Sequence, residues 1–277
     1  MRPNIIRQIA IVARYELLKY LRGRRLLAIV LLTVIVSAIF LVVPPAIGSQ
    51  YSKDPTEFVT NTLQFLSVLS ILSATFFGAD AIVSEFESKT GYFLFPNPIR
   101  KTTIFLGKFV ASALVSVGAI ALYYLIAVAS VRVIDGSIPA NTGLSFAYSL
   151  VYLFAILAVA YLFSAVMRSS VYSLILTFFT FFLILPIVSS VGELAKFKPW
   201  FSITFSSGIA TDILKNPYPT DTMIATTAGR GAGVPEPGAL ISGAQYYPAV
   251  TVSLIVMAAY FIVAFLLAIV LTRRREM

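Results

Sequence analysis

The sequence predicts an all-α integral membrane protein with six transmembrane helices. Hydrophobic residues make up 58% of the 277 residues, more than a soluble domain of this size can bury. Six apolar runs are long enough to cross a bilayer, which takes roughly 20 residues of helix. Charged residues, only 12% of the chain, lie almost entirely outside these runs.

The N-terminal segment, residues 1–25, is predicted to form an interfacial amphipathic helix. Arg7, Arg14 and Arg25 share one face, because spacings of 7 and 11 residues return to the same side of a helix. Ile11 and Leu18 fall towards that basic side. The opposite, apolar side consists of Ile5, Ile9, Val12, Ala13 and Tyr20. Such a helix is either a simple anchor on the inner leaflet or a lever that transmits motion into the first span.

Six spans are predicted in order. They cover residues 26–43, 63–83, 109–131, 144–166, 171–191 and 250–271. The second is the most polar, because it is rich in Ser and Thr and carries Asp80. The third could begin near Ile104, with Lys108 extending to the headgroups. The first could instead be a cleaved signal sequence, but Pro44 and Pro45 also suit a helix end, and we treat it as a span.

The basic residues predict the orientation of the chain. With the N-terminus in the cytoplasm, 15 Lys and Arg residues lie on the cytoplasmic side and 6 outside. Counted over the short loops alone, the ratio is 15 to 2. Because cytoplasmic loops carry the excess of Lys and Arg, we expect a multi-pass protein of the plasma membrane with both termini in the cytoplasm. The net charge of +9 follows this orientation, so we expect no nucleic-acid partner.

Two connections carry most of the polar chemistry. Residues 84–108 form a charged cytoplasmic loop that Pro and Gly interrupt. Residues 192–249 form an outer loop that is too long for a simple connection. Its first part, residues 194–214, is amphiphilic and aromatic and could form short helices that dip into the outer leaflet. Several Pro and Gly residues then favour ordered turns rather than helix. We treat residues 1–277 as one domain.

Several kinds of catalytic site are excluded by composition. Cys and His are both absent, which removes disulfides, Cys/His metal sites, His-ligated haem and Ser–His or Cys–His catalysis. There is no phosphate-binding Gly-x-x-x-x-Gly-Lys-Ser/Thr motif, so energy for uphill transport must come from a partner or an ion flux. We therefore expect no metal, no bound cofactor and no catalytic residues in this chain.

Asp80 is the best candidate for an ionisable group in a span. It is either part of a pathway or gate, or a structural carboxylate that pairs with Lys108 or accepts a hydrogen bond from nearby Ser or Thr. An intramembrane aspartyl protease would need a second such Asp, which is missing. Tyr148 and Tyr152 share a helix face at a spacing of four residues. With the other aromatics of the spans, they favour a hydrophobic or amphiphilic substrate over a small ion.

Five short motifs, in order, resemble those of ABC-2 type ABC transporter permeases. Residues 13–22 (ARYELLKYLR) are similar to the family's A-R-x-E-L-x-x-x-x-R opening, and residues 85–90 (EFESKT) to its E-x-E-S-G-T. Residues 98–100 resemble P-V-x-R, and residues 107–108 resemble the G-K at the start of span three. Residues 164–170 (SAVMRSS) resemble the basic turn between spans four and five.

The resemblance implies a mechanism for the chain. Two six-span subunits, identical or homologous, would form the channel, and two cytoplasmic ABC ATPase subunits would bind ATP and Mg²⁺ and drive it. The loop after span two would carry a coupling helix that docks on the ATPase. The implied coupling residues are Glu85, Glu87, Lys89, Thr90, Gly91, Pro98, Arg100 and Lys101. Trp200 and Phe205 would belong to short re-entrant helices at the outer gate.

This resemblance predicts a non-enzymatic permease that exports a hydrophobic or amphiphilic substrate. Lys89 stands where the family often has Gly, so the turn in the coupling loop could be shifted by one residue. The alternatives are an ion-coupled carrier that uses Asp80, a lipid-modifying membrane enzyme, and a non-transporting scaffold. For residues 84–108, the alternative to a coupling loop is an ordinary charged loop that binds no ATPase.

Overall fold

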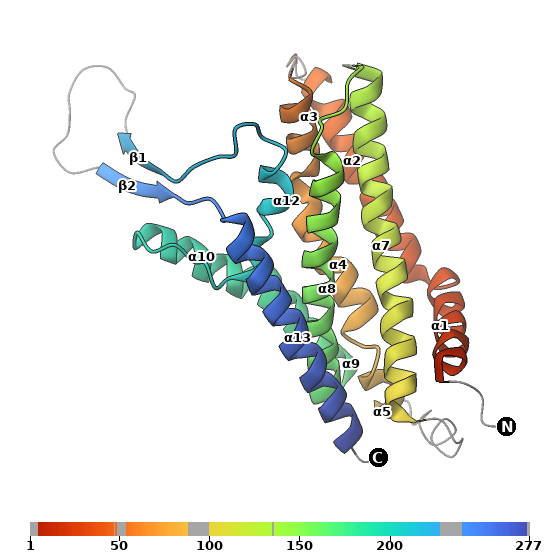
Figure 1. Cartoon of the computed structure of the whole chain (residues 1–277). Coiled ribbons are helices and arrows are strands. Elements are labelled where there is room, and N and C mark those ends of the chain that lie inside the picture. Colours follow the sequence, from red (N-terminus) through yellow and green to blue (C-terminus); the bar gives the residue numbers. More distant parts are fainter. Residues whose placement is uncertain are drawn as a thin grey trace.

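The computed structural model describes residues 5–46, 48, 54–87, 100–134, 136–227 and 240–275. Within these ranges the chain forms a bundle of long helices with one two-stranded hairpin at its side (Figure 1). Both ends of the chain lie at the same end of the bundle, which we call the termini end. The far end carries the start of the second span and the connection between the third and fourth.

A two-residue break at Arg22 and Gly23 forms the elbow between the first two helices. Helix α1 (Ile5–Leu21) packs beside the long helix α7 (Lys101–Ile134), and α2 (Arg24–Ala46) follows as the first span. The approach of α1 to α7 is close, because a Cβ at Gly107 would lie 2.7 Å from the Cβ of Val12. Ala13 and Tyr20, from the predicted apolar side of α1, are buried, whereas Ile5 of the same side is exposed at the first residue of the helix.

The second span is assembled from several pieces. It consists of α3 (Pro55–Thr62), a 3₁₀ turn η1 (Leu63–Phe65), α4 (Leu66–Gly78), a turn, and α5 (Val83–Glu87). The turn leaves backbone amides outside the helix, and Ser164 accepts two of them, from Ile82 at 2.9 Å and Val83 at 3.0 Å. A buried break of this kind requires such a partner, because an unpaired amide away from water costs free energy.

The core lies between α4, α7 and α8 (Thr142–Val166). Helix α8 is buried along most of its length, and the many Ala and Ser residues on its buried side let its neighbours approach closely. At Gly78 of α4, a Cβ would lie 2.8 Å from the Leu157 side chain. A hydroxyl chain crosses the core, since Ser112 lies 2.8 Å from the Tyr161 hydroxyl and 3.1 Å from that of Tyr20. Small side chains at helix contacts are typical of membrane bundles.

The fifth span bends at its middle. Helix α9 (Ser170–Phe179) passes into a π-helical segment, η2 (Thr180–Ile184), and then α10 (Leu185–Leu194), which leaves the bundle axis (Figure 1). Pro186 has no amide hydrogen and lies two residues after the end of the π segment. A proline and a π segment are both recognised causes of helix bending.

The segment before the last span contains the hairpin. Two short helices, α11 (Ile203–Ser206) and α12 (Ile209–Asp212), fulfil the expectation of short helices in this loop. Strands β1 (Thr222–Thr227) and β2 (Leu240–Gln245) then pair antiparallel, with Thr222 opposite Gln245. The prediction of turns rather than helix holds for the described residues between α12 and the last helix, and the hairpin is an addition to the all-α class. Helix α13 (Val250–Arg274) returns to the termini end.

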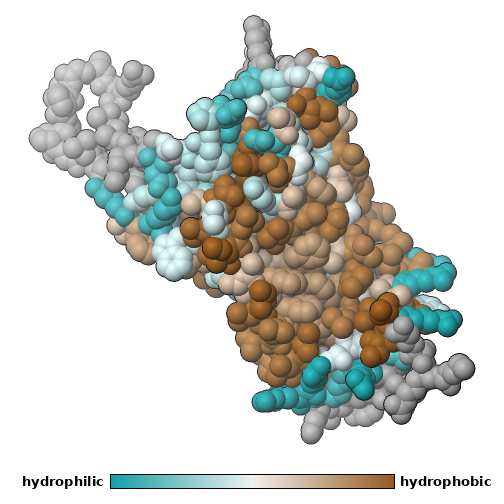
Figure 2. Space-filling view, in the orientation of Figure 1, coloured by the Kyte–Doolittle hydropathy of each residue, from teal (hydrophilic) through white to brown (hydrophobic). Residues whose placement is uncertain are grey.

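Six helical segments of the described chain are long and apolar enough to cross a membrane, which confirms the number of spans. They are Arg24–Ala46, Pro55–Glu87, Lys101–Ile134, Thr142–Val166, Ser170–Leu194 and Val250–Arg274. The visible surface is hydrophobic along the bundle and hydrophilic towards both ends (Figure 2). The third span begins before Ile104. Lys108 therefore lies inside the bundle and is only 2% exposed, and the expectation that it reaches the headgroups was wrong.

Candidate functional site

A buried cation joins three helices at the termini end. The Lys108 ammonium on α7 lies 2.6 Å from a Glu16 carboxylate oxygen on α1 and 2.7 Å from one of Glu85 on α5. Both acids are also largely buried, and the one ammonium lies between two carboxylates. Lys19, 3.5 Å from the other Glu16 oxygen, partly offsets the remaining negative charge. Loss of one member of such a group leaves an uncompensated buried charge, which makes the group a strong constraint on helix positions.

A second ion pair links the first span to the second. Arg25, at the start of α2, pairs with Asp80 in the turn between α4 and α5, and also donates to the Phe76 carbonyl at 3.2 Å. The sequence-based pairing of Asp80 with Lys108 was wrong, because Glu16 and Glu85 occupy that ammonium. Asp80 is 8% exposed, so it is a mostly buried carboxylate with its charge compensated by one cation.

Glu87 connects the end of the second span to the fifth. Its carboxylate accepts the Ser170 backbone amide at 2.8 Å and the Ser169 hydroxyl at 3.1 Å. These contacts satisfy a free amide at the start of α9, where a negative charge also interacts favourably with the helix dipole. Motion of α5 would therefore be transmitted to the start of α9.

The end of the last helix is attached to the same region. The Arg275 guanidinium donates to the Ser164 and Ala165 carbonyls at 3.3 and 3.2 Å and lies 4.3 Å from the Phe86 ring centre. Lys101 donates to the Arg275 carbonyl at 2.8 Å. Burial, with a smaller contribution from the nearby Arg168 charge, lowers the pKa of Arg275. Helix α5 is thus in contact with α7, α9 and the end of α13.

The predicted coupling residues are only partly described. Glu85, Glu87 and Lys101 belong to the contacts above, and Arg100 precedes α7, where its carbonyl accepts the Thr103 amide at 2.8 Å. Lys89, Thr90, Gly91 and Pro98 lie outside the described residues. The role of all eight in coupling stays a prediction.

Four residues that make these ion pairs and hydrogen bonds were not predicted from the sequence to do so: Glu16, Arg25, Ser164 and Arg275. Glu16 offered a signal, because it is the single acidic residue among residues 1–25 and shares a helix face with Ala13 and Tyr20. Ser164 and Arg275 offered none, since their partners are backbone groups of distant segments.

A second candidate site lies in the half of the bundle that carries the bend. It is a pocket of about 320 Å³ between α4, α8, η2, α10 and α11. Tyr152 and Phe205, both predicted for the pathway or gate, line it together. Asp80, Tyr148 and Trp200 do not line it, and Trp200 is exposed. The lining comprises Ser67, Val68, Ile71, Tyr152, Phe181, Phe182, Pro186, Ser189, Ser190, Glu193, Thr204, Phe205 and Ser207.

Hydroxyl groups connect the walls of this pocket. Ser67 on α4 lies 2.9 Å from Ser207, and Ser189 on α10 donates to Ser202 at 2.9 Å. The buried Tyr152 hydroxyl lies near Ser207, but it makes no hydrogen bond of good geometry among the described residues. An unsatisfied buried hydroxyl costs free energy, so the Tyr152 group is available to a bound polar atom. Phe181 and Phe182 supply an apolar wall.

The comparisons with known proteins identify the family of this chain. No group of acidic side chains that could hold a metal occurs within the described ranges. A family model described as "ABC-2 family transporter protein" matches residues 10–277. A search of curated proteins found no match. Because the family model covers nearly the whole chain, this protein belongs to the ABC-2 family of transporter permeases, the membrane components of ABC transporters.

Proposed function

We propose that this chain is the permease subunit of an ATP-driven exporter of hydrophobic or amphiphilic molecules. ATP hydrolysis would take place in a separate nucleotide-binding subunit that docks on residues 84–108. The family match supports a transporter membrane subunit. The missing phosphate-binding motif supports a separate source of energy.

The observation that carries this proposal is the attachment of α5. This short helix (Val83–Glu87) forms the start of the proposed docking segment, and it contacts α1 and α7 through Lys108 and α9 through Glu87. A displacement of the docking segment by an ATPase would therefore move several helix ends together. Packed interfaces with discrete ion pairs favour a shift between two arrangements over a gradual deformation.

The pocket lined by Tyr152 supports the choice of substrate. Its phenylalanines suit an apolar moiety, and its hydroxyls suit a polar head that exchanges hydrogen bonds. It lies beside the bend in the fifth span, so a change in that bend would change the shape of the pocket. We place the termini end in the cytoplasm on the strength of the Lys and Arg distribution.

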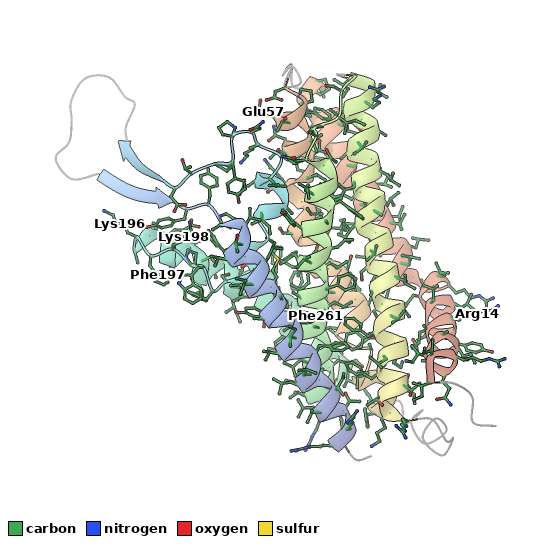
Figure 3. The ribbon with its side chains drawn as sticks, in the orientation of Figure 1. Arg14, Glu57, Lys196, Phe197, Lys198 and Phe261 are labelled. Carbon is green, nitrogen blue, oxygen red and sulfur yellow. The ribbon has the colours of Figure 1, made fainter. Side chains whose placement is uncertain are left out.

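An uncoupling variant tests this proposal. In the complex with its ATPase, Glu87→Ala should reduce transport per ATP hydrolysed by severalfold, because the link from α5 to α9 is lost. Arg100→Ala serves as a second variant next to the docking segment. Glu57→Ala, an exposed carboxylate on α3 at the far end, is the matched control (Figure 3). Wild-type coupling in both termini-end variants would contradict the proposal.

The ion-coupled carrier makes a different prediction. Asp80 pairs with Arg25 at the termini end and does not line the Tyr152 pocket, which argues against a role as a transported-ion site. Transport that continues after ATP depletion and stops with an ionophore would favour the carrier. Transport that stops with ATP depletion alone would favour the ATP-driven permease.

A further inference from the structure

A separate pocket lies at the elbow between α1 and α2. It has a volume of about 450 Å³ and is bounded by the end of α1, the start of α2 and the turn that carries Asp80. Lys19, Arg24 and Arg25 line it, and Ser84 adds a hydroxyl. Nothing in the permease function proposed above uses this pocket.

The elbow pocket has an excess of positive charge. Its one acidic lining residue, Asp80, is already paired with Arg25. Lys19 approaches Glu16 only at 3.5 Å, and the other oxygen of that carboxylate binds Lys108 at 2.6 Å. Arg24 has no ion pair within the described part of the chain. Arg24 therefore remains for an anionic ligand, while Lys19 shares the Glu16 carboxylate with Lys108. Arg presents a fork of donors that matches a phosphate group.

An exposed apolar stripe begins beside the pocket. Leu27, Leu31 and Ile35 on α2 are all at least half exposed, at 60%, 51% and 54%. They follow Arg24 at spacings that return to its side of the helix. A ligand with a charged head in the pocket and apolar chains along α2 would contact both surfaces, which a free inorganic anion would not.

We propose that the elbow pocket binds the headgroup of an anionic phospholipid. The lipid phosphate would interact with Lys19 and Arg24, and an acyl chain would lie along Leu27, Leu31 and Ile35. Basic pockets between helices at the membrane surface suit anionic headgroups, and each Lys or Arg there adds to the affinity. Such a lipid would stabilise the angle between α1 and α2.

The test is a lipid titration of the purified chain followed by native mass spectrometry. Phosphatidylglycerol should bind more tightly than phosphatidylcholine. The double variant Lys19→Gln/Arg24→Gln should weaken the phosphatidylglycerol affinity by about 30-fold and leave phosphatidylcholine unchanged. The control Arg7→Gln/Arg14→Gln removes the same charge from exposed positions of α1, and Arg14 points away from the bundle (Figure 3).

Three results would overturn the proposal. They are equal affinity for the two lipids, an equal loss in the Arg7/Arg14 control, and displacement of the lipid by inorganic phosphate at matched concentration, which would indicate a free-anion site. A cross-linking measurement on the wild-type chain does not depend on the folding of any variant. A phosphatidylglycerol with a photoactivatable headgroup should label residues 19–25, and labelling elsewhere only would equally refute the site.

Discussion

The termini end of this permease and the region around the Tyr152 pocket are held together by different interactions. At the termini end, charged groups link α1, α2, α5 and α7 through the Glu16–Lys108–Glu85 cluster and the Arg25–Asp80 pair. Around the Tyr152 pocket, neutral hydroxyl contacts such as Ser67–Ser207 and Ser189–Ser202 connect the walls. Buried charged contacts are costly to break, whereas neutral hydrogen bonds are readily exchanged for others. The termini end is therefore suited to transmit motion, and the pocket to change shape.

The largest effect is expected from Lys108→Met. This substitution leaves two largely buried carboxylates without their cation and should lower the free energy of unfolding by about 3–5 kcal/mol. Thermal unfolding in one detergent measures the effect. The control is Lys19→Met, because Lys19 is 61% exposed and lies 3.5 Å from Glu16. Equal effects for the two variants would mean that the buried cluster is not the main constraint at this end.

The next effect concerns the packing of α1 on α7. Gly107→Ala places a methyl group 2.7 Å from Val12 and 3.1 Å from the Ile9 carbonyl, so α1 must move away. We expect a loss of about 1–3 kcal/mol, typical of overpacked contacts. Gly118→Ala, on the same helix with nothing within 4 Å of the new methyl group, should be neutral or stabilising. A similar loss in both variants would refute close packing at Gly107.

A smaller effect is expected at Asp80. Asp80→Asn removes the ion pair but retains a hydrogen-bond acceptor for Arg25, which is half-exposed and can be solvated. Asp80→Lys places a second cation beside Arg25 and should reduce the yield of folded protein much more than Asp80→Asn does. Membrane-fraction yield and monodispersity measure this. If Asp80→Asn is produced normally yet abolishes transport, Asp80 belongs to the pathway after all.

The smallest effect is expected near the pocket. Ser189→Ala removes the hydroxyl that donates to Ser202, but Ser202 keeps a contact with Thr204 at 2.9 Å. The expected loss in stability is about 1 kcal/mol or less. Thermal unfolding of Ser189→Ala and of Lys108→Met, measured under the same conditions, would show whether the pocket region and the termini end differ in this way. A loss as large as that of Lys108→Met would remove the contrast between them.

Local patterns predicted the spans, whereas distant pairings required the structure. The six apolar runs and the helix of residues 1–25 follow from neighbouring residues, so their existence was predictable. The partners of Lys108 could not be predicted in this way, because Glu16 is 92 positions away and the choice depends on how α1 packs against α7. The hairpin was missed although residues 222–227 (TMIATT) are rich in β-branched types, since Pro and Gly dominated the interpretation of that loop.

The measurement closest to the central claim is a pull-down of this chain from its native membrane in mild detergent, with mass spectrometry of bound proteins. Residues 84–87 hold structural contacts in α5, so the matched variant scrambles residues 88–99 only and leaves Glu85 and Glu87 in place. If an ATPase docks on this segment, a stoichiometric ATPase with a phosphate-binding motif should remain bound to the wild-type chain and be lost from the correctly inserted scrambled variant. A chain that purifies alone and still moves solute under an ion gradient would contradict this docking.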